Sequence, residues 1–283
     1  MLYVAGRPSL TNARLVAAFQ ASGLEVAVVD PPDVEPMRGD VVLARLDVRS
    51  TLDGVEDGLW RLKAAERAGA RVLNRPGPLL SAHDKLATAI LLGRAGVLHP
   101  RTVHAAGLRR AFPFGPPYVV KPRFGSWGKD VLRCESLSEL EACLRRLVAR
   151  PWFQRQGVLV QELVRPTGID LRLVVARGEV VGAVCRIAPA GEWRTNVALG
   201  AVRRPVEPPP AARAAALRAT EALGIDLAGV DVVVRADGSP VVLELNGAVD
   251  YTPEYGLAGA DPFAAAADAL VERPAAALAA AAR

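Results

Sequence analysis

The chain has 283 residues, 51% of them hydrophobic and 23% charged, a composition typical of a globular protein with roughly two or three small domains. Its net charge of +5 comes from 35 basic and 30 acidic residues that are mixed along the chain, and only 5% of the residues are aromatic, so a nucleic-acid-binding protein is not expected. No run of about 18 apolar residues is free of charge, so we expect no membrane span.

The N-terminus and the cysteines favour a cytoplasmic protein. The segment from Met1 to Leu10 leads directly into a strand–turn–helix pattern and has no signal-peptide cleavage region. Three cysteines without a CxxC pair argue for a reducing compartment and against disulfides or structural zinc: Cys134, Cys143 and Cys185. The histidines form no ligand cluster, and we interpret all three as surface or loop residues: His83, His99 and His104.

Residues 1 to about 75 alternate short apolar strands with helices, the pattern of βαβ units around a parallel sheet. The expected strands are Leu2–Ala5, Leu24–Val29, Val41–Leu46 and Arg71–Leu73, and the expected helices are Ser9–Ser22 and Gly58–Ala68. The turn after the first strand lacks GxGxxG, so this fold does not imply a bound dinucleotide. Arg45 and Arg49, near the end of the third strand, are candidate carboxylate binders, although each alone is also explained as a surface arginine.

The middle and C-terminal parts mix strands and helices without repeats. Residues 76–80 are expected to form a linker, followed by a helix from about Ser81 to Ala95. A Ser-x-x-Glu capping box, Ser138 and Glu141, predicts the start of a helix that runs to Ala149. The remaining expected elements are strands at 118–121, 158–163, 171–175 and 180–186, a helix at 208–223, and an Ala-rich terminal helix within 263–282.

The most informative segment is an acidic hairpin at residues 229–247. Two apolar runs flank the turn signal of residues 236–239, and they carry Asp231 on one side and Glu244 and Asn246 on the other. Residues two apart on a strand face the same side, so Glu244 and Asn246 point together, and pairing of the strands would bring Asp231 beside them. Two carboxylates and an amide oxygen form a set suited to Mg²⁺, although solvated charges flanking a hairpin are the alternative.

Two lysines and a glycine loop indicate an anion site. Only four of the 35 basic residues are lysine, which favours a specific role for Lys85 and for Lys121, which ends an apolar strand. Each lysine alone is also explained by surface exposure. The loop Gly125–Gly128 can converge backbone N–H groups on an anion or act as a mobile lid, although a plain tight turn has the same sequence character.

Polar residues between 161 and 196 are suited to a nucleotide. Gln161 and Glu162 end an apolar strand whose edge can offer backbone groups to an adenine. Asp170 and Arg172 share one face of the next strand, and Arg186 ends its partner strand. A following loop adds the segment Arg194–Asn196. Converging basic, acidic and amide groups are what a nucleotide triphosphate and its metals require.

The motifs occur in one order: Asp-Lys, Val-Val-Lys-Pro, the glycine loop, Gln-Glu, Asp-x-Arg, Arg-x-Asn, Gly-Val-Asp and Glu-x-Asn. This order resembles the ATP-grasp superfamily and, within it, the RimK-type carboxylate–amine ligases, which include the α-L-glutamate ligases and the lysine-biosynthesis ligase LysX. The resemblance covers residues from Val72 to about Leu270 and the small N-terminal domain. The segments 126–128 and 195–198 are closest to LysX, whereas the loop 247–255 departs from both subfamilies and leaves the substrate open.

The resemblance implies an α/β (α+β) protein of ATP-grasp fold with an N-terminal Rossmann-like (pre-ATP-grasp) domain. It places this domain at residues 1–77, a small lid subdomain at 78–155, and a large subdomain with the metal site at 156–283. The residues that it implies at the ATP are Lys85, Lys121, Gly125, Ser126, Trp127, Gly128, Gln161, Glu162, Leu163, Asp170 and Arg194. It further implies that Arg172, Arg186 and Asn196 surround the transferring phosphate. Asp231, Glu244 and Asn246 would hold two Mg²⁺ or Mn²⁺ ions.

The implied activity is ATP-dependent amide or peptide bond formation through an acyl phosphate, which requires no nucleophilic side chain of the protein. The amine would be an amino acid such as glutamate, and the carboxylate would belong to a peptide, an acidic carrier protein or a small molecule. Homodimers or homotetramers are consistent with the resemblance. The alternative is an inactive ATP-binding module with a regulatory or scaffolding role, which should have lost a metal ligand or Lys121, and none is lost here.

Overall fold

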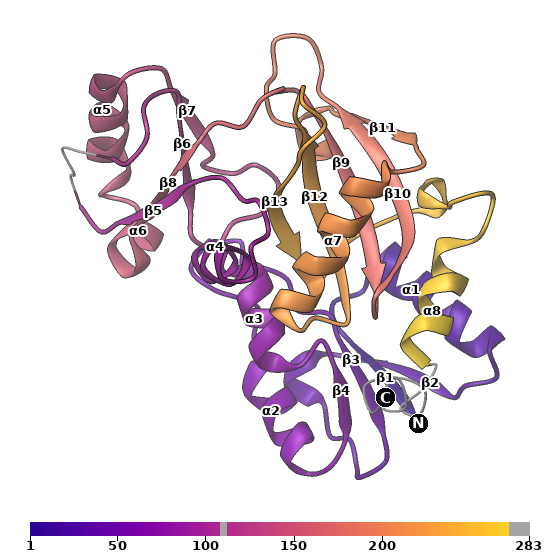
Figure 1. Ribbon diagram of the computed structural model, residues 1–283. Helices are drawn as coiled ribbons and strands as arrows, with labels where there is room; N and C mark the ends of the chain where they lie inside the picture. Colours follow the sequence, from indigo (N-terminus) through magenta and orange to yellow (C-terminus); the bar gives the residue numbers. More distant parts are fainter. Residues whose placement is uncertain (108–111, 272–283) are drawn as a thin grey trace.

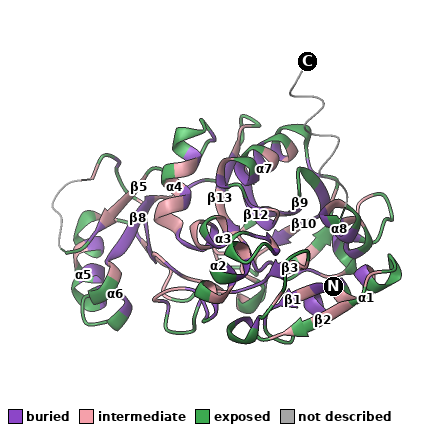
Figure 2. Cartoon of the chain, turned by 90° about the horizontal axis from the view of Figure 1, so that it is seen from below, coloured by how far each residue is buried: buried purple, intermediate pink, exposed green. Residues whose placement is uncertain are grey.

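The computed structural model of the protein describes residues 1–107 and 112–271 (Figure 1). These residues form three sheets, with the N-terminal domain below the other two parts in the view of Figure 1. Buried residues line the strands where the parts meet, while the outer faces of the helices are exposed (Figure 2). Within these residues, no helix has the length and apolar character needed to cross a membrane.

The N-terminal domain confirms the predicted parallel sheet. Its strand order is β2-β1-β3-β4, and every neighbouring pair is parallel. Ser9 caps the first helix, because its Oγ accepts a hydrogen bond from the N–H of Asn12 at 3.1 Å. The elements are β1 (Leu2–Ala5), α1 (Leu10–Ala21), β2 (Val26–Val29), η1 (Pro31–Asp33), β3 (Val41–Ala44), α2 (Leu59–Arg67) and β4 (Arg71–Leu73).

Residues 76–95 differ from the prediction. The expected linker is helical, because Pro76 occupies the first helical turn, where proline is tolerated. The expected single helix is broken at Asp84, which has an extended backbone and accepts hydrogen bonds from the N–H groups of Leu86 and Ala87. The result is α3 (Pro76–His83) followed by α4 (Lys85–Arg94), and the break places Lys85 at a helix start.

The small subdomain is an antiparallel sheet of order β5-β8-β6-β7. Its strands are β5 (Thr102–Ala105), β6 (Tyr118–Pro122), β7 (Leu132–Cys134) and β8 (Val158–Glu162), and its helices are α5 (Leu137–Leu147) and α6 (Pro151–Gln156). An apolar core between sheet and helices contains Tyr118, Val120, Trp152 and the free thiols of Cys134 and Cys143. Strand β8, expected in the large subdomain that starts at 156, therefore lies in the small sheet.

The helix cap in the small subdomain was predicted two residues too late. Ser136, rather than Ser138, caps α5, because its Oγ accepts from the N–H of Glu139 at 3.2 Å. The carboxylate of Glu139 in turn accepts from the N–H of Glu135 at 2.8 Å. Leu140 and Leu144 lie on the face of this helix that packs in the core.

The large subdomain is an antiparallel sheet of order β11-β10-β9-β12-β13. Its elements are β9 (Ile169–Ala176), β10 (Glu179–Ile187), η2 (Val197–Leu199), β11 (Val202–Pro205), α7 (Pro210–Leu223), β12 (Leu227–Val234), β13 (Pro240–Asn246), η3 (Pro253–Tyr255) and α8 (Pro262–Val271). The end of the predicted Ala-rich helix, 272–282, lies outside the described residues. Helix α7 packs on one face of the sheet, and α8 and the N-terminal domain pack on the opposite face, which also carries the polar side chains described below.

Asn74 joins the N-terminal domain to the large subdomain. Its side chain is fully buried and donates to the carbonyls of Leu227 and Gly247, each at 2.9 Å. Its Oδ1 accepts from the N–H groups of Asp226 and Leu227. Its φ of 55° lies in the left-handed region, which asparagine tolerates better than most residues. One side chain therefore satisfies four backbone groups at the junction.

We expect Asn74→Ala to lower the free energy of unfolding by about 3 kcal/mol, because it leaves buried backbone groups without partners. Urea denaturation followed by circular dichroism measures the change. The matched control is Gln20→Ala, on the exposed side of α1, which should shift stability by no more than about 0.5 kcal/mol. Equal stabilities of the two variants would contradict the role given to Asn74.

Candidate active site

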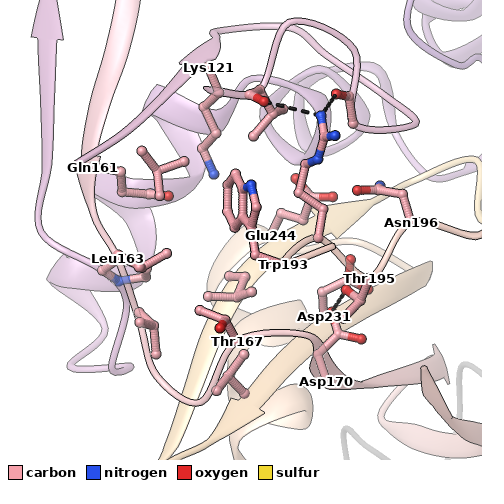
Figure 3. Close-up of a pocket in the computed structure, with 18 of the residues that line it drawn as sticks. Lys121, Gln161, Leu163, Thr167, Asp170, Trp193, Thr195, Asn196, Asp231 and Glu244 are labelled. Carbon is pink, nitrogen blue, oxygen red and sulfur yellow. Dashed lines mark hydrogen bonds between the residues drawn. The ribbon is translucent and has the colours of Figure 1, made fainter. Parts of the chain in front are cut away.

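A cavity lies between the small sheet and the polar face of the large sheet (Figure 3). Strands β6 and β8 and the loop 125–131 form one side, and β9, β12 and β13 form the other. Its apolar lining includes Val119, Leu163, Val164, Val233 and Leu243. Its polar lining includes Lys85, Lys121, Gln161, Asp170, Arg186, Asn196, Asp231 and Glu244. A slot with apolar walls and charged groups is suited to a ligand that has a flat apolar part and an anionic part.

A buried chain of alternating charges forms part of the cavity lining. Arg172 donates to both carboxylate oxygens of Asp231, at 2.7 and 2.8 Å. Arg186 donates to Asp231 at 2.7 Å and, through its Nε, to Asp170 at 2.8 Å. The strand register explains the pairing, because Arg172 lies opposite Asp231 and Arg186 lies opposite Asp170. Thr195 completes the group by donating to Asp170 at 2.6 Å (Figure 3).

These contacts set the charge states of the aspartates. Burial alone would raise the pKa of Asp231, but Arg172 and Arg186 outweigh it and hold that pKa well below its usual value. For Asp170, the effect of burial is larger than that of Arg186, so the pKa is raised. The pKa of the Arg186 guanidinium rises well above its usual value because, despite its burial, two carboxylates share it. Asp231 is therefore ionised at neutral pH in this cavity.

Lys121 reaches the cavity from the buried strand β6, as its position in the sequence predicted. It is 7% exposed, and its ammonium makes no hydrogen bond to any described residue. Burial lowers the pKa of Lys121 to about 8, with the carboxylate of Glu244 opposing the shift. Lys85 lies close by, with its Nζ 2.6 Å from the Gly125 carbonyl and 3.4 Å from Glu244. An ammonium that faces the cavity without a hydrogen-bond partner can donate to an anionic ligand.

The predicted acidic hairpin is present, with Asp231 directly opposite Glu244 on the neighbouring strand. Burial would raise the pKa of Glu244, but the nearby lysines outweigh it and the pKa is lowered. The described residues contain no group of three His, Cys, Asp or Glu side chains arranged to hold a metal ion. Two ionised carboxylates and the amide of Asn246 are nevertheless all oxygen donors, which fits the ligand preference of Mg²⁺. Asn246 Oδ1 presently accepts from the N–H of Ala248 at 2.8 Å.

The glycine loop packs against the loop that carries Arg194 and Asn196. Gly128 has a φ of +71°, and a Cβ there would lie 2.8 Å from Asn196 Oδ1. Arg194 donates to the carbonyls of Gly128 and Val131, both at 3.2 Å, while its guanidinium is also held by Glu192. Arg194 thus binds the loop, and it also lines the cavity, where the resemblance implies a contact with the ligand. The loop residues Gly125, Ser126, Trp127 and Gly128 all line the cavity.

At the apolar end, the cavity is lined by the last two residues of β8 and by Leu163, which follows the strand. Gln161 donates from its Nε2 to Thr102 Oγ1 at 2.7 Å. The carboxylate of Glu162 accepts from the N–H of Arg101 at 2.9 Å and from its Nε at 2.8 Å. These two polar side chains are already bonded to Thr102 and Arg101. A flat ring bound at this end would therefore be recognised by backbone groups and apolar contacts.

A second cavity adjoins the first and was not foreseen. The two share Lys85, Gly125, Ser126, Trp127, Arg186, Asn196 and Glu244. The second adds Asp47 and His83 from the N-terminal side, Arg172 and Arg203 from the large sheet, and Asn246, Ala248 and Asp250 from β13 and the following loop. Asp47 follows β3 at the carboxyl end of a parallel sheet, where α/β proteins commonly bind ligands, so the sequence did contain this signal.

Three readings of single residues need correction. His83 is buried in α3 and is only 4% exposed, and His104 lies within β5, so neither is a surface loop residue. Burial lowers the pKa of His83 to about 3. Arg45 is 3% exposed and donates to Asn12 and to the Val249 carbonyl, so it bridges two domains and is not free at the surface.

The family comparison agrees with this geometry. Residues 82–257 match the model of the RimK-like ATP-grasp domain. A curated relative from Thioalkalivibrio sulfidiphilus, named probable alpha-L-glutamate ligase, is 33% identical over 255 residues, which cover 82% of each chain.

Solved structures show the same fold. The D-cycloserine synthetase DcsG superposes with a TM-score of 0.70 at 26% identity, over 95% of this chain and 99% of that one. The ATP-grasp ligase PsnB, solved with a minimal precursor, Mg and ADP, superposes with a TM-score of 0.68 over 95% of this chain and 96% of that one. At 22% identity, this second likeness supports the fold alone.

Arg186→Met should destabilise the protein by about 3–5 kcal/mol at pH 7, because it leaves two buried carboxylates short of a cation. The loss should shrink toward pH 4. In the wild type, the lowered pKa of Asp231 contributes stability above its unfolded pKa, and this contribution is lost as the pH falls through the lowered value. In the variant, protonation relieves the unpaired charges.

Denaturant unfolding of both proteins between pH 4 and 8 measures this difference. Arg204→Met, an exposed arginine on the neighbouring strand β11, is the matched control and should change stability little at any pH. A loss for Arg186→Met that is constant over this pH range would show that packing, and not charge pairing, is its cause.

Proposed function

The chain belongs to the RimK-like ATP-grasp family and is an ATP-dependent ligase, and from this membership we propose that it forms an amide bond between an amino acid and a carboxylate through an acyl phosphate. The observation that supports this most is the pair of adjoining cavities with a shared wall of Lys85, Arg186, Asn196 and Glu244. One cavity would take the nucleotide and the other the two substrates, so that the phosphoryl group is transferred at the shared wall.

In the first cavity, the adenine would lie against Leu163, Val233 and Leu243, with backbone groups of Glu162 and Leu163 at its edge and Asp170 near the ribose. The phosphates would lie toward Lys121 and Lys85, beneath the lid 125–128. Lys121 is the strongest element of this assignment, because this buried lysine lines the cavity without a hydrogen-bond or ion-pair partner among the described residues, and a polyphosphate would supply one. Arg194 would act through the lid that it holds.

We propose that the oxygen donors of Asp231, Glu244 and Asn246 would hold Mg²⁺, with two ions per site. Bound there, the metal would neutralise charge on the transferring phosphoryl group. The chain itself contributes Arg172, Arg186 and Asn196, which line the substrate cavity beside Glu244. These side chains would orient the reacting carboxylate and stabilise the acyl phosphate. Lys85, 3.4 Å from Glu244, would keep that carboxylate ionised.

The substrates are proposed from the relatives. One relative is named probable alpha-L-glutamate ligase, and one structural neighbour was solved with a precursor peptide. We therefore propose glutamate as the first amine to test, and the carboxylate of a peptide, a carrier protein or a small molecule as its partner. The three free thiols fit a reducing compartment such as the cytoplasm.

Purified protein should release ADP from MgATP only when both a carboxylate and an amine are present, because the acyl phosphate turns over by aminolysis. A coupled ADP assay with L-glutamate and peptides ending in glutamate tests this, and mass spectrometry identifies the amide. Background ADP release across a broad panel, from folded protein that binds ATP, would contradict the ligase proposal. ATP binding that is indifferent to Mg²⁺ would instead support an inactive module.

Glu244→Gln should lower ADP release by about a hundredfold or more, because the Mg²⁺ ions would lose a negatively charged ligand. The near-isosteric change should alter the free energy of unfolding by about 1 kcal/mol or less. Glu179→Gln, at the exposed end of β10, is the matched control and should keep wild-type turnover. Normal activity of Glu244→Gln would rule out the metal assignment, and calorimetry of ATP binding with and without Mg²⁺ gives a second readout.

A further inference from the structure

Arg203 is a basic residue of the second cavity whose charge the protein leaves largely unpaired. It lies on β11, the edge strand of the large sheet (Figure 1), and it lines the second cavity but not the first. Its guanidinium donates no hydrogen bond to any described residue, and its ion pair with Glu254 is loose, with 3.6 Å between Nε and Oε2. The Glu254 side chain is 57% exposed, and an ion pair with an exposed carboxylate contributes little. The donors of Arg203 are therefore available to a ligand.

Strand pairing places Arg203 beside another arginine. Strands β10 and β11 are antiparallel, and Arg203 lies directly opposite Arg186, so both side chains project from the same face of the sheet. Like charges in directly opposite positions destabilise a sheet. Arg186 is compensated on its other side by Asp170 and Asp231, and Asp231 is also bonded by Arg172, so these carboxylates are already in use. An anionic ligand at Arg203 would neutralise the charge that remains where β11 borders the cavity.

The position of Arg203 separates its ligand from the reacting carboxylate. The proposed phosphoryl transfer takes place at the wall shared by both cavities, which includes Arg186 and Glu244 but not Arg203. Neighbouring strands are about 4.8 Å apart, so a group held by Arg203 lies roughly one strand spacing beyond a group held by Arg186. In an α-amino acid, the amine and the α-carboxylate are bonded to the same carbon atom. An amine that attacks an acyl phosphate at Arg186 would thus bring its own carboxylate close to Arg203.

We propose that Arg203 binds the carboxylate of the amino-acid amine and thereby selects amines that carry one. The inference rests on the proposed ligase function and names a residue that recognises the incoming substrate. A guanidinium presents its donors as a planar fork that matches a carboxylate. Other cations of this cavity are closely paired with carboxylates, Lys85 with Glu244 and Arg172 with Asp231. Arg203 can bind a carboxylate without breaking such a pair.

The test separates recognition of the amine from acyl-phosphate formation. Arg203→Gln and Arg203→Lys are compared with the wild type, using L-glutamate as the amine and a peptide ending in glutamate as the carboxylate. In a parallel assay, hydroxylamine, a nucleophile without a carboxylate, replaces L-glutamate. Its nitrogen attacks the acyl carbon, phosphate leaves, and a hydroxamate is formed.

Two further variants serve as controls. Arg204→Gln changes the next residue of the same strand, which is exposed and projects to the opposite face of the sheet. Glu254→Gln removes the loose ion pair but leaves the guanidinium of Arg203 in place. It therefore distinguishes a binding role of Arg203 from a purely structural one.

The KM for L-glutamate should rise about ten- to hundredfold in Arg203→Gln, because charged hydrogen bonds to the carboxylate are lost. Arg203→Lys keeps the positive charge and should recover part of this loss. Hydroxamate formation, the KM for ATP and the kcat at saturating L-glutamate should stay within about twofold of wild type, as expected for lost ground-state binding. Arg204→Gln and Glu254→Gln should behave like the wild type.

An unchanged KM for L-glutamate in Arg203→Gln would overturn the assignment. An equal loss of hydroxamate formation would also overturn it, because Arg203 would then act on the carboxylate substrate, and so would the same defect in Glu254→Gln. Failure of the proposed function is distinct, because the wild type would then form neither ADP nor hydroxamate. Calorimetry of L-glutamate binding in the presence of MgADP still decides in that case: weaker binding to Arg203→Gln alone supports the subsite, whereas equal binding to both proteins, or binding to neither, overturns it.

Discussion

Two aspartates and two arginines lie next to one another on three neighbouring strands. Their opposite charges must stay paired, and this requirement restricts how the three strands can be arranged. Asp170, Arg186 and Asp231 are each at most 4% exposed, so none of them can exchange its partners for bulk water. Removing one member would leave a charge without compensation in a medium of low dielectric constant. The register of β9, β10 and β12 must therefore be kept, and this register also positions Glu244 opposite Asp231.

The same charges explain why two cavities meet at this point. Arg186 is bound to carboxylates and also lines both cavities, so an anionic ligand in either one would compete with Asp170 and Asp231 for its donors. A cation bound to Asp231 would weaken that competition, because it would replace the charge of the guanidinium. Binding of an anion and of a metal ion at this wall is thus coupled by simple electrostatics. Lys121 adds a cation that no described carboxylate pairs by hydrogen bond or ion pair.

The sequence predicted those features that depend on local signals. The turn at residues 236–239 and the period of two along its strands were enough to bring Asp231 and Glu244 together. The break at Asp84 was missed because Ser81 to Ala95 reads as one apolar helical run, and the contact with Arg123 that helps to hold Asp84 comes from a distant strand end. The salt bridges of Arg172 and Arg186, the placement of β8 and the second cavity were missed for the same reason. The Arg172–Asp231 pair and the placement of β8 arise from strand pairing between segments far apart in the chain, and the second cavity brings together residues as distant as Asp47 and Asp250.

The substrate end of the molecule is built from loops that the domain junction holds in place. Asn74 ties β4 to the start of β12 and to Gly247, and Arg45 ties β3 to the carbonyl of Val249. Further along the same loop, Tyr251 stacks on Phe263 of α8 with ring centroids 4.4 Å apart. Asp47 and Asp250 are therefore displayed from rigid backbone, although one follows β3 and the other follows β13. Substitutions in these two loops can change the lining of the second cavity without altering the strand residues that bear the buried charges. Motifs shared across ATP-grasp ligases therefore indicate the fold and the nucleotide, whereas the residues after β3 and β13 line the second cavity, which we propose for the substrates.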